Sequence, residues 1–103
     1  MNIALLANYK SLDYQILLVK VKSLFPEDLV LDLSRHTGND WKKSEQNRIN
    51  DISNSSLVIV CQNWQAHVDV IHDLTEAQRG KKDIFIEFEG RFVPLTQQTA
   101  RVW

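Results

Sequence analysis

The chain lacks the motifs that mark several large protein classes. It has one cysteine in 103 residues, so an internal disulfide cannot form and a reducing, cytoplasmic location is expected. A G-x-G-x-x-G turn, a Walker lysine motif, an H-E-x-x-H pair and a cysteine pair are all missing from the sequence. These absences disfavour the usual dinucleotide, triphosphate and zinc sites, and we expect neither a metal nor a cofactor.

The chain also has no large excess of positive or negative charge and no long apolar run. The formal net charge is −1, and the basic residues are scattered apart from Lys42-Lys43 and Lys81-Lys82. A nucleic-acid polymer is therefore not an expected partner. The apolar run that begins at Ile3 is too short to span a bilayer and has no basic leader, so we predict a first strand and no membrane partner.

Apolar runs alternate with helical patterns along the whole chain, which predicts one domain over residues 1–103. The expected strands are Ile3–Ala7, Leu29–Leu33, Leu57–Cys61, Ile84–Phe88 and a short fifth at Arg91–Val93. The expected helices run from about Leu12 to Leu24, from Trp41 or Lys42 to Ser53, and from Gln65 to Arg79, with a polar loop at Ser34–Asp40. This order predicts an α/β fold: a small doubly wound, flavodoxin-like, mostly parallel sheet of four to five strands with helices on both faces.

Two local signals support the first helix. Ser11 can cap it, and Pro26 ends it. Its apolar residues recur at helical spacing in two rows: Leu12, Ile16 and Val19, and Leu17, Val21 and Leu24. In the second helix we expect Ile49 and Ile52 to face inward. Residues 96–103 carry no clear pattern.

The expected strand order 2-1-3-4 predicts where a ligand would bind. Its topological switch point lies between the first and third strands, and ligands of such sheets bind beyond the carboxyl ends of the strands. The residues just past these ends are Asn8, Tyr9 and Lys10 on one side and Gln62, Asn63 and Trp64 on the other. Lys10 could meet a phosphate, and Trp64 could either stack on a base or cover the core.

Asp73 lies at the edge of the buried face of the third helix, from where it could point along the sheet toward the switch point. Ala66, Val70, Leu74 and Ala77 share one face of the third helix; Asp73 sits beside that face, and His72 points nearly the opposite way. Asp73 is either a reactive carboxylate or a solvated surface acid. His67 either binds a phosphate or acts as an acid, or packs locally, and Cys61 fits a structural thiol. Asp69, His72 and Asp73 have metal-like spacing, but no recognised metal motif supports a site.

From Trp41 onward the chain resembles the nucleoside 2-deoxyribosyltransferase-like superfamily, in particular its short bacterial and phage members. The matching features are the Trp-opened helix, the run Ser55–Val60, Asn63-Trp64, and an acid nine residues past Trp64. The resemblance implies a nucleoside or nucleotide as the small-molecule partner, cleavage or transfer at an N-glycosidic bond, and a homodimer. It assigns the carboxylate nucleophile to Asp73, with Trp64 and Tyr9 on the base and Lys10 and Asn63 on phosphate or sugar hydroxyls.

The chain departs from the superfamily pattern at several positions. The usual nucleophile is glutamate, so Asp73 is one methylene shorter. His67-Val68-Asp69 replaces a serine–glycine element, and Arg48 and Ser56 stand where aspartates are common. Asn8-Tyr9-Lys10 replaces a glycine-bearing turn.

A weaker similarity is to TIR domains, carried by Asp32-Leu33-Ser34 and by Ile52 with Ser55–Val60. It implies NAD cleavage or self-association. The sequence thus leaves three functions open: a glycosidic-bond enzyme, a non-catalytic nucleotide-binding module, and a TIR-like domain.

Overall fold

The computed structural model describes residues 1–36, 40–88 and 90–95. Ten elements follow one another along the chain. They are β1 (Asn2–Leu6), α1 (Leu12–Leu24), β2 (Leu29–Leu31), the 3-10 turn η1 (Leu33–His36), α2 (Trp41–Ser53), β3 (Leu57–Val60), the 3-10 turn η2 (Trp64–Ala66), α3 (Val68–Arg79), β4 (Asp83–Phe88) and β5 (Arg91–Pro94). Residues 37–39, which include Gly38 of the expected polar loop, and residues 96–103 lie outside the described part of the chain.

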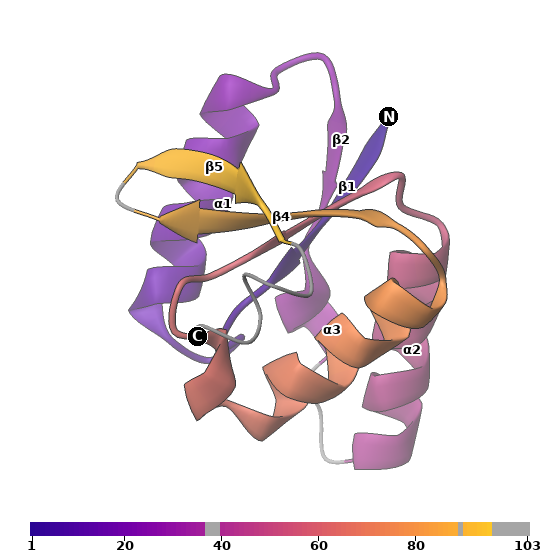
Figure 1. The fold of residues 1–103 in the computed structure, drawn as a ribbon. Coiled ribbons are helices and arrows are strands. Elements are labelled where there is room, and N and C mark those ends of the chain that lie inside the picture. The colour runs from indigo at the N-terminus through magenta and orange to yellow at the C-terminus, as the bar shows by residue number, and fades with distance from the viewer. Residues whose placement is uncertain (37–39, 89, 96–103) are drawn as a thin grey trace.

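One five-stranded sheet organises the molecule, in the order β2-β1-β3-β4-β5. The first four strands are parallel, and β5 pairs antiparallel with β4. Helix α1 covers one face of the sheet, whereas α2 and α3 lie together on the other (Figure 1). The predicted fold class is confirmed, including the 2-1-3-4 order of the parallel strands.

The two central strands carry the core. Every residue from Ile3 to Leu6 and from Leu57 to Val60 is buried, as expected for parallel strands with helices on both faces. The register sets Leu6 beside Val60. The carboxyl ends of β1 and β3 therefore stop at the same level of the sheet.

Helix boundaries follow the local capping chemistry. Ser11 caps α1, its side chain accepting from the Tyr14 backbone N–H, as predicted. Asp40 caps α2 in the same way through Lys43, so the helix opens at Trp41. The second strand is shorter than predicted, because the Asp32 side chain accepts a hydrogen bond from the Ser34 N–H and the chain then turns into η1. The expected loop from Ser34 was therefore wrong over its first three residues.

The predicted helix Gln65–Arg79 was wrong in its first turn. The backbone is extended at His67, with φ −127° and ψ 115°, and this residue separates η2 from α3. A continuous helix would set the Trp64 side chain about 120° away from that of Val70 around the helix axis. The break allows both side chains to be buried, and it leaves Ala66 exposed instead of on the face of Val70, Leu74 and Ala77.

Helix α1 buries only part of its apolar surface. Leu17 and Val21 face the sheet together with Tyr14 and Leu18. The row Leu12, Ile16 and Val19 is instead 75%, 58% and 68% exposed. The Tyr14 hydroxyl accepts a hydrogen bond from the Leu33 N–H at 3.0 Å, which fixes the rotation of the helix and turns that row outward.

This rotation predicts that two leucine-to-alanine substitutions on α1 lower the free energy of unfolding by very different amounts. We expect Leu17→Ala to lower the free energy of unfolding by ~2–5 kcal/mol because it leaves a cavity in the core. Leu12→Ala should change it by less than ~0.5 kcal/mol, because the side chain is mostly in water. Urea denaturation of the two variants measures both values, and equal losses would contradict the assigned rotation.

Candidate functional site

The site begins where β1 and β3 end. The Cys61 N–H donates to the Leu6 carbonyl at 3.0 Å, which is the last rung between the two strands before the chains separate. Beyond it, Asn8 and Asn63 are both exposed. This divergence is the predicted topological switch point, and three hollows lie along it.

Two hollows share Ala7, Asn8 and His67 in their linings, and we call them together the switch-point groove. The larger has a volume of about 240 Å³ and lies against the start of α3. Its lining is Ala7, Asn8, Tyr9, Ala66, His67, Val68, Asp69 and Val70. The smaller has a volume of about 130 Å³. Its lining is Ala7, Asn8, Ser11, Asp13, Cys61, Asn63 and His67.

A third hollow of about 240 Å³ continues past Cys61 and Asn63 toward α1. It is also lined by Asp13, Ile16, Leu17, Lys20, Gln62 and Glu87. Lys20 reaches across to Glu87 with an N–O distance of 2.9 Å, so this cation is already paired. We call this space the α1 hollow.

The turn after β1 is built by its own hydrogen bonds. The Asn8 carbonyl accepts from the Ser11 N–H at 2.9 Å and from the Ser11 hydroxyl at 2.8 Å. Ser11 then caps α1, so one serine ties the turn to the helix. The turn directs Tyr9 inward, where it is 5% exposed, and leaves Lys10 exposed.

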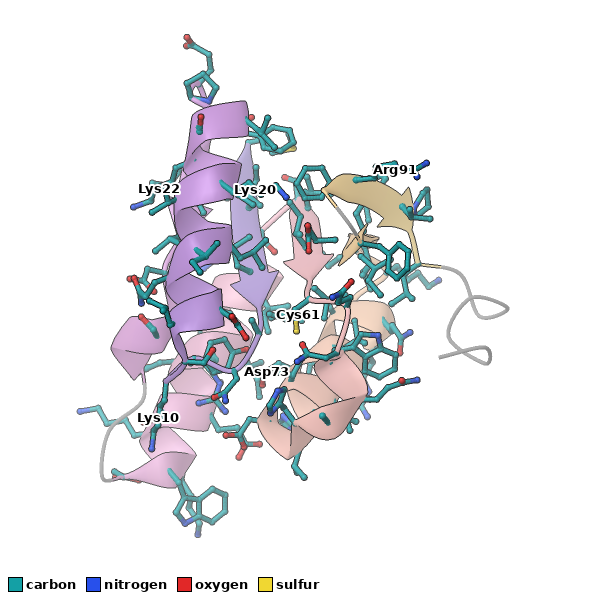
Figure 2. The ribbon with its side chains drawn as sticks, turned by 90° about the vertical axis from the view of Figure 1, so that its left-hand side faces the viewer. Lys10, Lys20, Lys22, Cys61, Asp73 and Arg91 are labelled. Carbon is teal, nitrogen blue, oxygen red and sulfur yellow. The ribbon has the colours of Figure 1, made fainter. Side chains whose placement is uncertain are left out.

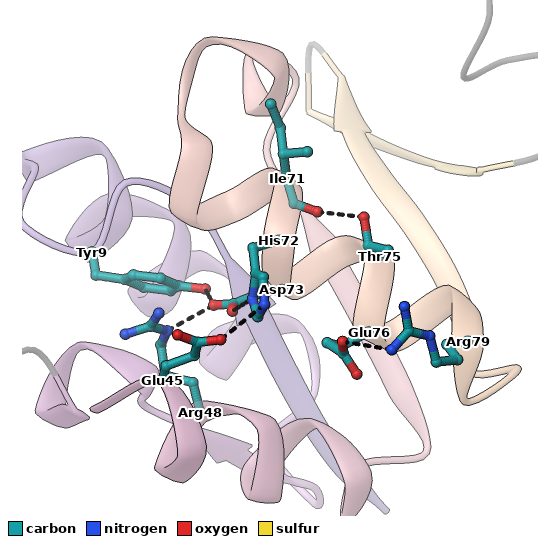
Figure 3. A network of polar contacts seen from close by, with 9 residues as sticks. All are labelled: Tyr9, Glu45, Arg48, Ile71, His72, Asp73, Thr75, Glu76 and Arg79. Atoms are coloured by element: carbon teal, nitrogen blue, oxygen red, sulfur yellow. Dashed lines mark hydrogen bonds and ion pairs between the residues drawn. The ribbon is translucent and has the colours of Figure 1, made fainter. Parts of the chain in front are cut away.

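Asp73 lies at the centre of a buried polar network rather than in the groove (Figure 3). It is 0% exposed, and its Oδ2 accepts the Tyr9 hydroxyl at 2.6 Å and the Arg48 Nε–H at 2.8 Å. The Arg48 guanidinium also lies over the Tyr9 ring, 5.4 Å from its centroid. One carboxylate thus joins the β1–α1 turn, α2 and α3.

The second oxygen of Asp73 faces a histidine. His72 Nδ1 lies 3.3 Å from Asp73 Oδ1, and its Nε2 lies 2.9 Å from Glu45 Oε1. Both ring nitrogens therefore meet carboxylate oxygens, which an imidazolium would satisfy with two N–H donors. The expectation that His72 points away from the apolar face of α3 into solvent is correct only in part, because its side chain is 41% exposed but both ring nitrogens contact carboxylates.

This enclosure bears on the chemistry of Asp73. A nucleophile must reach the carbon that it attacks, and the carboxylate is covered by Tyr9 and Arg48. Asp73 also does not line any of the three hollows, although Tyr9, which covers it, lines the larger part of the switch-point groove. The surface-acid alternative is wrong, and the catalytic role stays a prediction that requires Tyr9 to move.

The other predicted residues divide into two groups. Asn8, Asn63 and His67 come together along the switch-point groove, and the His67 side chain makes no capping bond to the described backbone of α3. Trp64 packs in the core cluster with 9% exposure, as in the core-covering alternative. Its Nε1 has no hydrogen-bond partner among residues 1–36, 40–88 and 90–95.

Sequence reasoning missed Arg48 and Glu45 as parts of this region. Ser44, Arg48 and Ile52 lie four residues apart from one to the next, and these three form the buried row of α2. A charged residue in line with a buried isoleucine was the available signal, because a cation on that row needs an acid opposite it. The sequence could not name Asp73 as that acid, because the two helices are brought together only by the sheet.

Burial changes the acidity of two groups beside the site. Desolvation raises the pKa of Tyr9 well above 10.0, and the negative charge of Asp73 raises it further. Desolvation also raises the pKa of the Cys61 thiol. A raised pKa disfavours the thiolate, so the geometry agrees with a structural thiol at the end of β3.

Within the described ranges, no group of three or more His, Cys, Asp or Glu residues is arranged to hold a metal ion. None of the described helices is long and apolar enough to cross a bilayer. Comparison of the chain with protein-family models, curated proteins and solved structures gave no match.

The buried ion pair predicts strong coupling between α2 and α3. We expect Arg48→Met and Asp73→Asn each to lower the free energy of unfolding by ~3–5 kcal/mol, because each leaves the partner charge buried and unpaired. The double variant should lose ~1–3 kcal/mol less than the sum of the singles. Urea denaturation of the four proteins measures this coupling.

The exposed pair Arg79–Glu76 on α3 supplies the control for this cycle. Its N–O distance is 3.1 Å and the Arg79 side chain is 72% exposed. Arg79→Met and Glu76→Gln should couple by no more than ~1 kcal/mol. Simple additivity of the Arg48 and Asp73 variants would mean that the buried network does not hold the helices together.

The raised pKa of Tyr9 predicts loss of stability in alkali. A phenol whose pKa is higher in the folded state contributes stability that is complete below its unfolded value of 10.0 and declines as the pH rises above it. Tyr14, whose pKa is also raised mainly by burial, adds to this effect. We expect the urea midpoint to fall between pH 9 and pH 11, and to fall less in Tyr9→Phe; an unchanged pH dependence in that variant would contradict the assignment.

Proposed function

We propose that this chain is a non-catalytic nucleoside-binding module, and that the switch-point groove is its ligand site. The proposal rests mainly on the separation between the groove and the enclosed carboxylate of Asp73. Hydrogen-bonding groups converge on the groove, whereas the only acid assigned to glycosidic chemistry is occupied by Tyr9 and Arg48. Such an arrangement favours holding a small polar molecule over attacking it.

The lining groups match the chemistry of a nucleoside. The amides of Asn8 and Asn63 each offer donors and an acceptor for the edge of a base. The carboxylates of Asp13 and Asp69 can accept hydrogen bonds from sugar hydroxyls. His67 lines both hollows of the groove, and an imidazole ring can stack on a base.

The charges of the groove favour a nucleoside over a nucleotide. Asp13 and Asp69 contribute negative charge to its lining, and Lys20, in the neighbouring α1 hollow, is paired with Glu87. A phosphate in the groove would meet these carboxylates at close range. Lys10, the residue assigned to phosphate from the sequence, is exposed and lines neither hollow of the groove.

In this proposal Asp73 is a positioning residue. It anchors Tyr9, and Tyr9 forms part of the groove wall beside Asn8. The shorter aspartate at the position where the resembled superfamily has glutamate agrees with this role, because it fits between Arg48 and Tyr9. The superfamily resemblance supplies the ligand class, and the groove supplies its location.

Binding is tested by titrating the full chain with 2′-deoxynucleosides, the matching 5′-monophosphates and NAD, using isothermal calorimetry. We expect at least one nucleoside to bind, and its monophosphate to bind more weakly. Asn63→Ala should raise the Kd roughly two- to twelvefold through one lost hydrogen bond. Asn50→Ala, an exposed asparagine on α2, is the matched control and should leave the Kd unchanged.

Chromatography of the same mixtures after incubation separates binding from reaction. Binding without free base supports the module. Free base that disappears in an Asp73→Asn protein shown by circular dichroism to be folded would instead establish the glycosidic-bond enzyme. Free nicotinamide from NAD would favour the TIR-like alternative. The absence of binding by every nucleoside and nucleotide would overturn the assignment of the groove.

A further inference from the structure

Helix α1 presents an apolar row to solvent that the fold does not use. Leu12, Ile16 and Val19 follow one another at spacings of four and three residues, which aligns them along one side of the helix. Their exposed fractions are 75%, 58% and 68%. Ser23 continues the same line at the carboxyl end and is small enough to admit a neighbouring side chain.

The charges beside this row are distributed unevenly along the helix. Asp13 lies in the first turn, whereas Lys20 and Lys22 lie in the second half. Figure 2 shows Lys20 and Lys22 on opposite sides of α1. By helical spacing, Asp13 falls on the same side of the row as Lys20. The surface of α1 is therefore acidic at one end and basic at the other.

We propose that this row, Leu12, Ile16, Val19 and Ser23, is the contact face of a homodimer in which α1 of one copy packs antiparallel against α1 of a second copy. The charge pattern selects the antiparallel direction, because a parallel pair would bring the lysines together. A two-fold axis between Ile16 and Val19 sets Ile16 of one copy against Val19 of the other and Leu12 against Ser23.

The same arrangement pairs the flanking charges. Asp13 of one copy comes within about 3 Å, along the helix axis, of Lys20 of the second copy, because each residue advances ~1.5 Å. The Lys20 ammonium also binds Glu87 of its own chain, so it would be shared between the two carboxylates. The two helix dipoles also run in opposite directions, which is favourable. The apolar row and the charges thus favour the same alignment of the two α1 helices, as expected of a self-complementary face.

The second copy would lie beside the α1 hollow but is not proposed to occupy it. Asp13, Ile16 and Lys20 line the α1 hollow, so α1 of the second copy would run beside its mouth. The two-fold axis brings the α1 hollows of both copies to the same side of the helix pair. The inference is independent of nucleoside binding, because it depends only on the exposed row and its charges.

The contact is one helix wide, well below the ~800 Å² per partner of a standard interface, so we expect a weak dimer with a Kd of about 10–100 µM. Sedimentation equilibrium of the full chain from about 5 to 500 µM tests this expectation. The mean mass should rise from the monomer value of 12.0 kDa toward twice that value. A mass that stays at 12.0 kDa across the whole range would overturn the proposal.

Substitutions identify the face. Ile16→Asp and Val19→Asp should each raise the dimer Kd at least tenfold, because each buries a charge at the centre of the contact. Leu24→Asp is the matched control: Leu24 is 53% exposed on the same helix but lies off the row, so its Kd should not change. Equal weakening by all three variants, or by none, would overturn the assigned face; circular dichroism verifies that each variant is folded.

Cross-linking tests the register in a Cys61→Ser background. A mixture of Leu12→Cys and Ser23→Cys proteins, oxidised with copper phenanthroline, should form the mixed disulfide in preference to either homodisulfide. The antiparallel register separates the two Ser23 positions by about 16 Å along the axis. A predominant Leu12→Cys homodisulfide would indicate parallel pairing and overturn the proposal.

Discussion

The buried ion pair between Arg48 and Asp73 is the interaction on which the arrangement of the site depends. It joins α2 to α3, and the Tyr9 hydroxyl attaches the β1–α1 turn to the same carboxylate oxygen. A charge placed in the protein interior is costly unless its partners are held in good geometry. The three elements are therefore constrained to meet at one point beneath the carboxyl end of the sheet.

This constraint separates the acid from the groove above it. Tyr9 forms the boundary: its hydroxyl binds Asp73, and its side chain helps to line the larger hollow. On the groove side, Asn8, Asn63 and His67 present polar groups to a cavity open to solvent. The same tyrosine thus closes the carboxylate and shapes the space in which a ligand would lie. The carboxylate to which the sequence resemblance assigned attack instead binds the residue that forms the wall of the groove.

The two helix layers contribute in different ways. Helices α2 and α3 share a buried polar contact, so their mutual position is fixed within one chain. Among the helices that the structure describes, α1 is the one on its face of the sheet, and Tyr14 fixes its rotation through the bond to Leu33. That rotation directs Leu17 and Val21 into the core and leaves Leu12, Ile16 and Val19 in water. The proposed second copy would cover these three exposed apolar side chains of α1.

The order of strands and helices, and hence the location of the switch point, could be predicted from the residue pattern alone. Continuous apolar runs such as Ile3–Leu6 and Leu57–Val60 require cover on both faces, and Ser11 and Pro26 delimit a helix through local chemistry. Asn8, Asn63 and His67 could be assigned to one edge because parallel strands end at the same side of a sheet. Three features are visible only in the folded chain: which of two rows of α1 is buried, where α3 begins, and that Asp73 faces Arg48 and Tyr9. The hydrogen bonds that fix the first and the third join residues 19 to 64 positions apart in the chain. Periodicity along a single element carries no information about which charge or ring will stand opposite it.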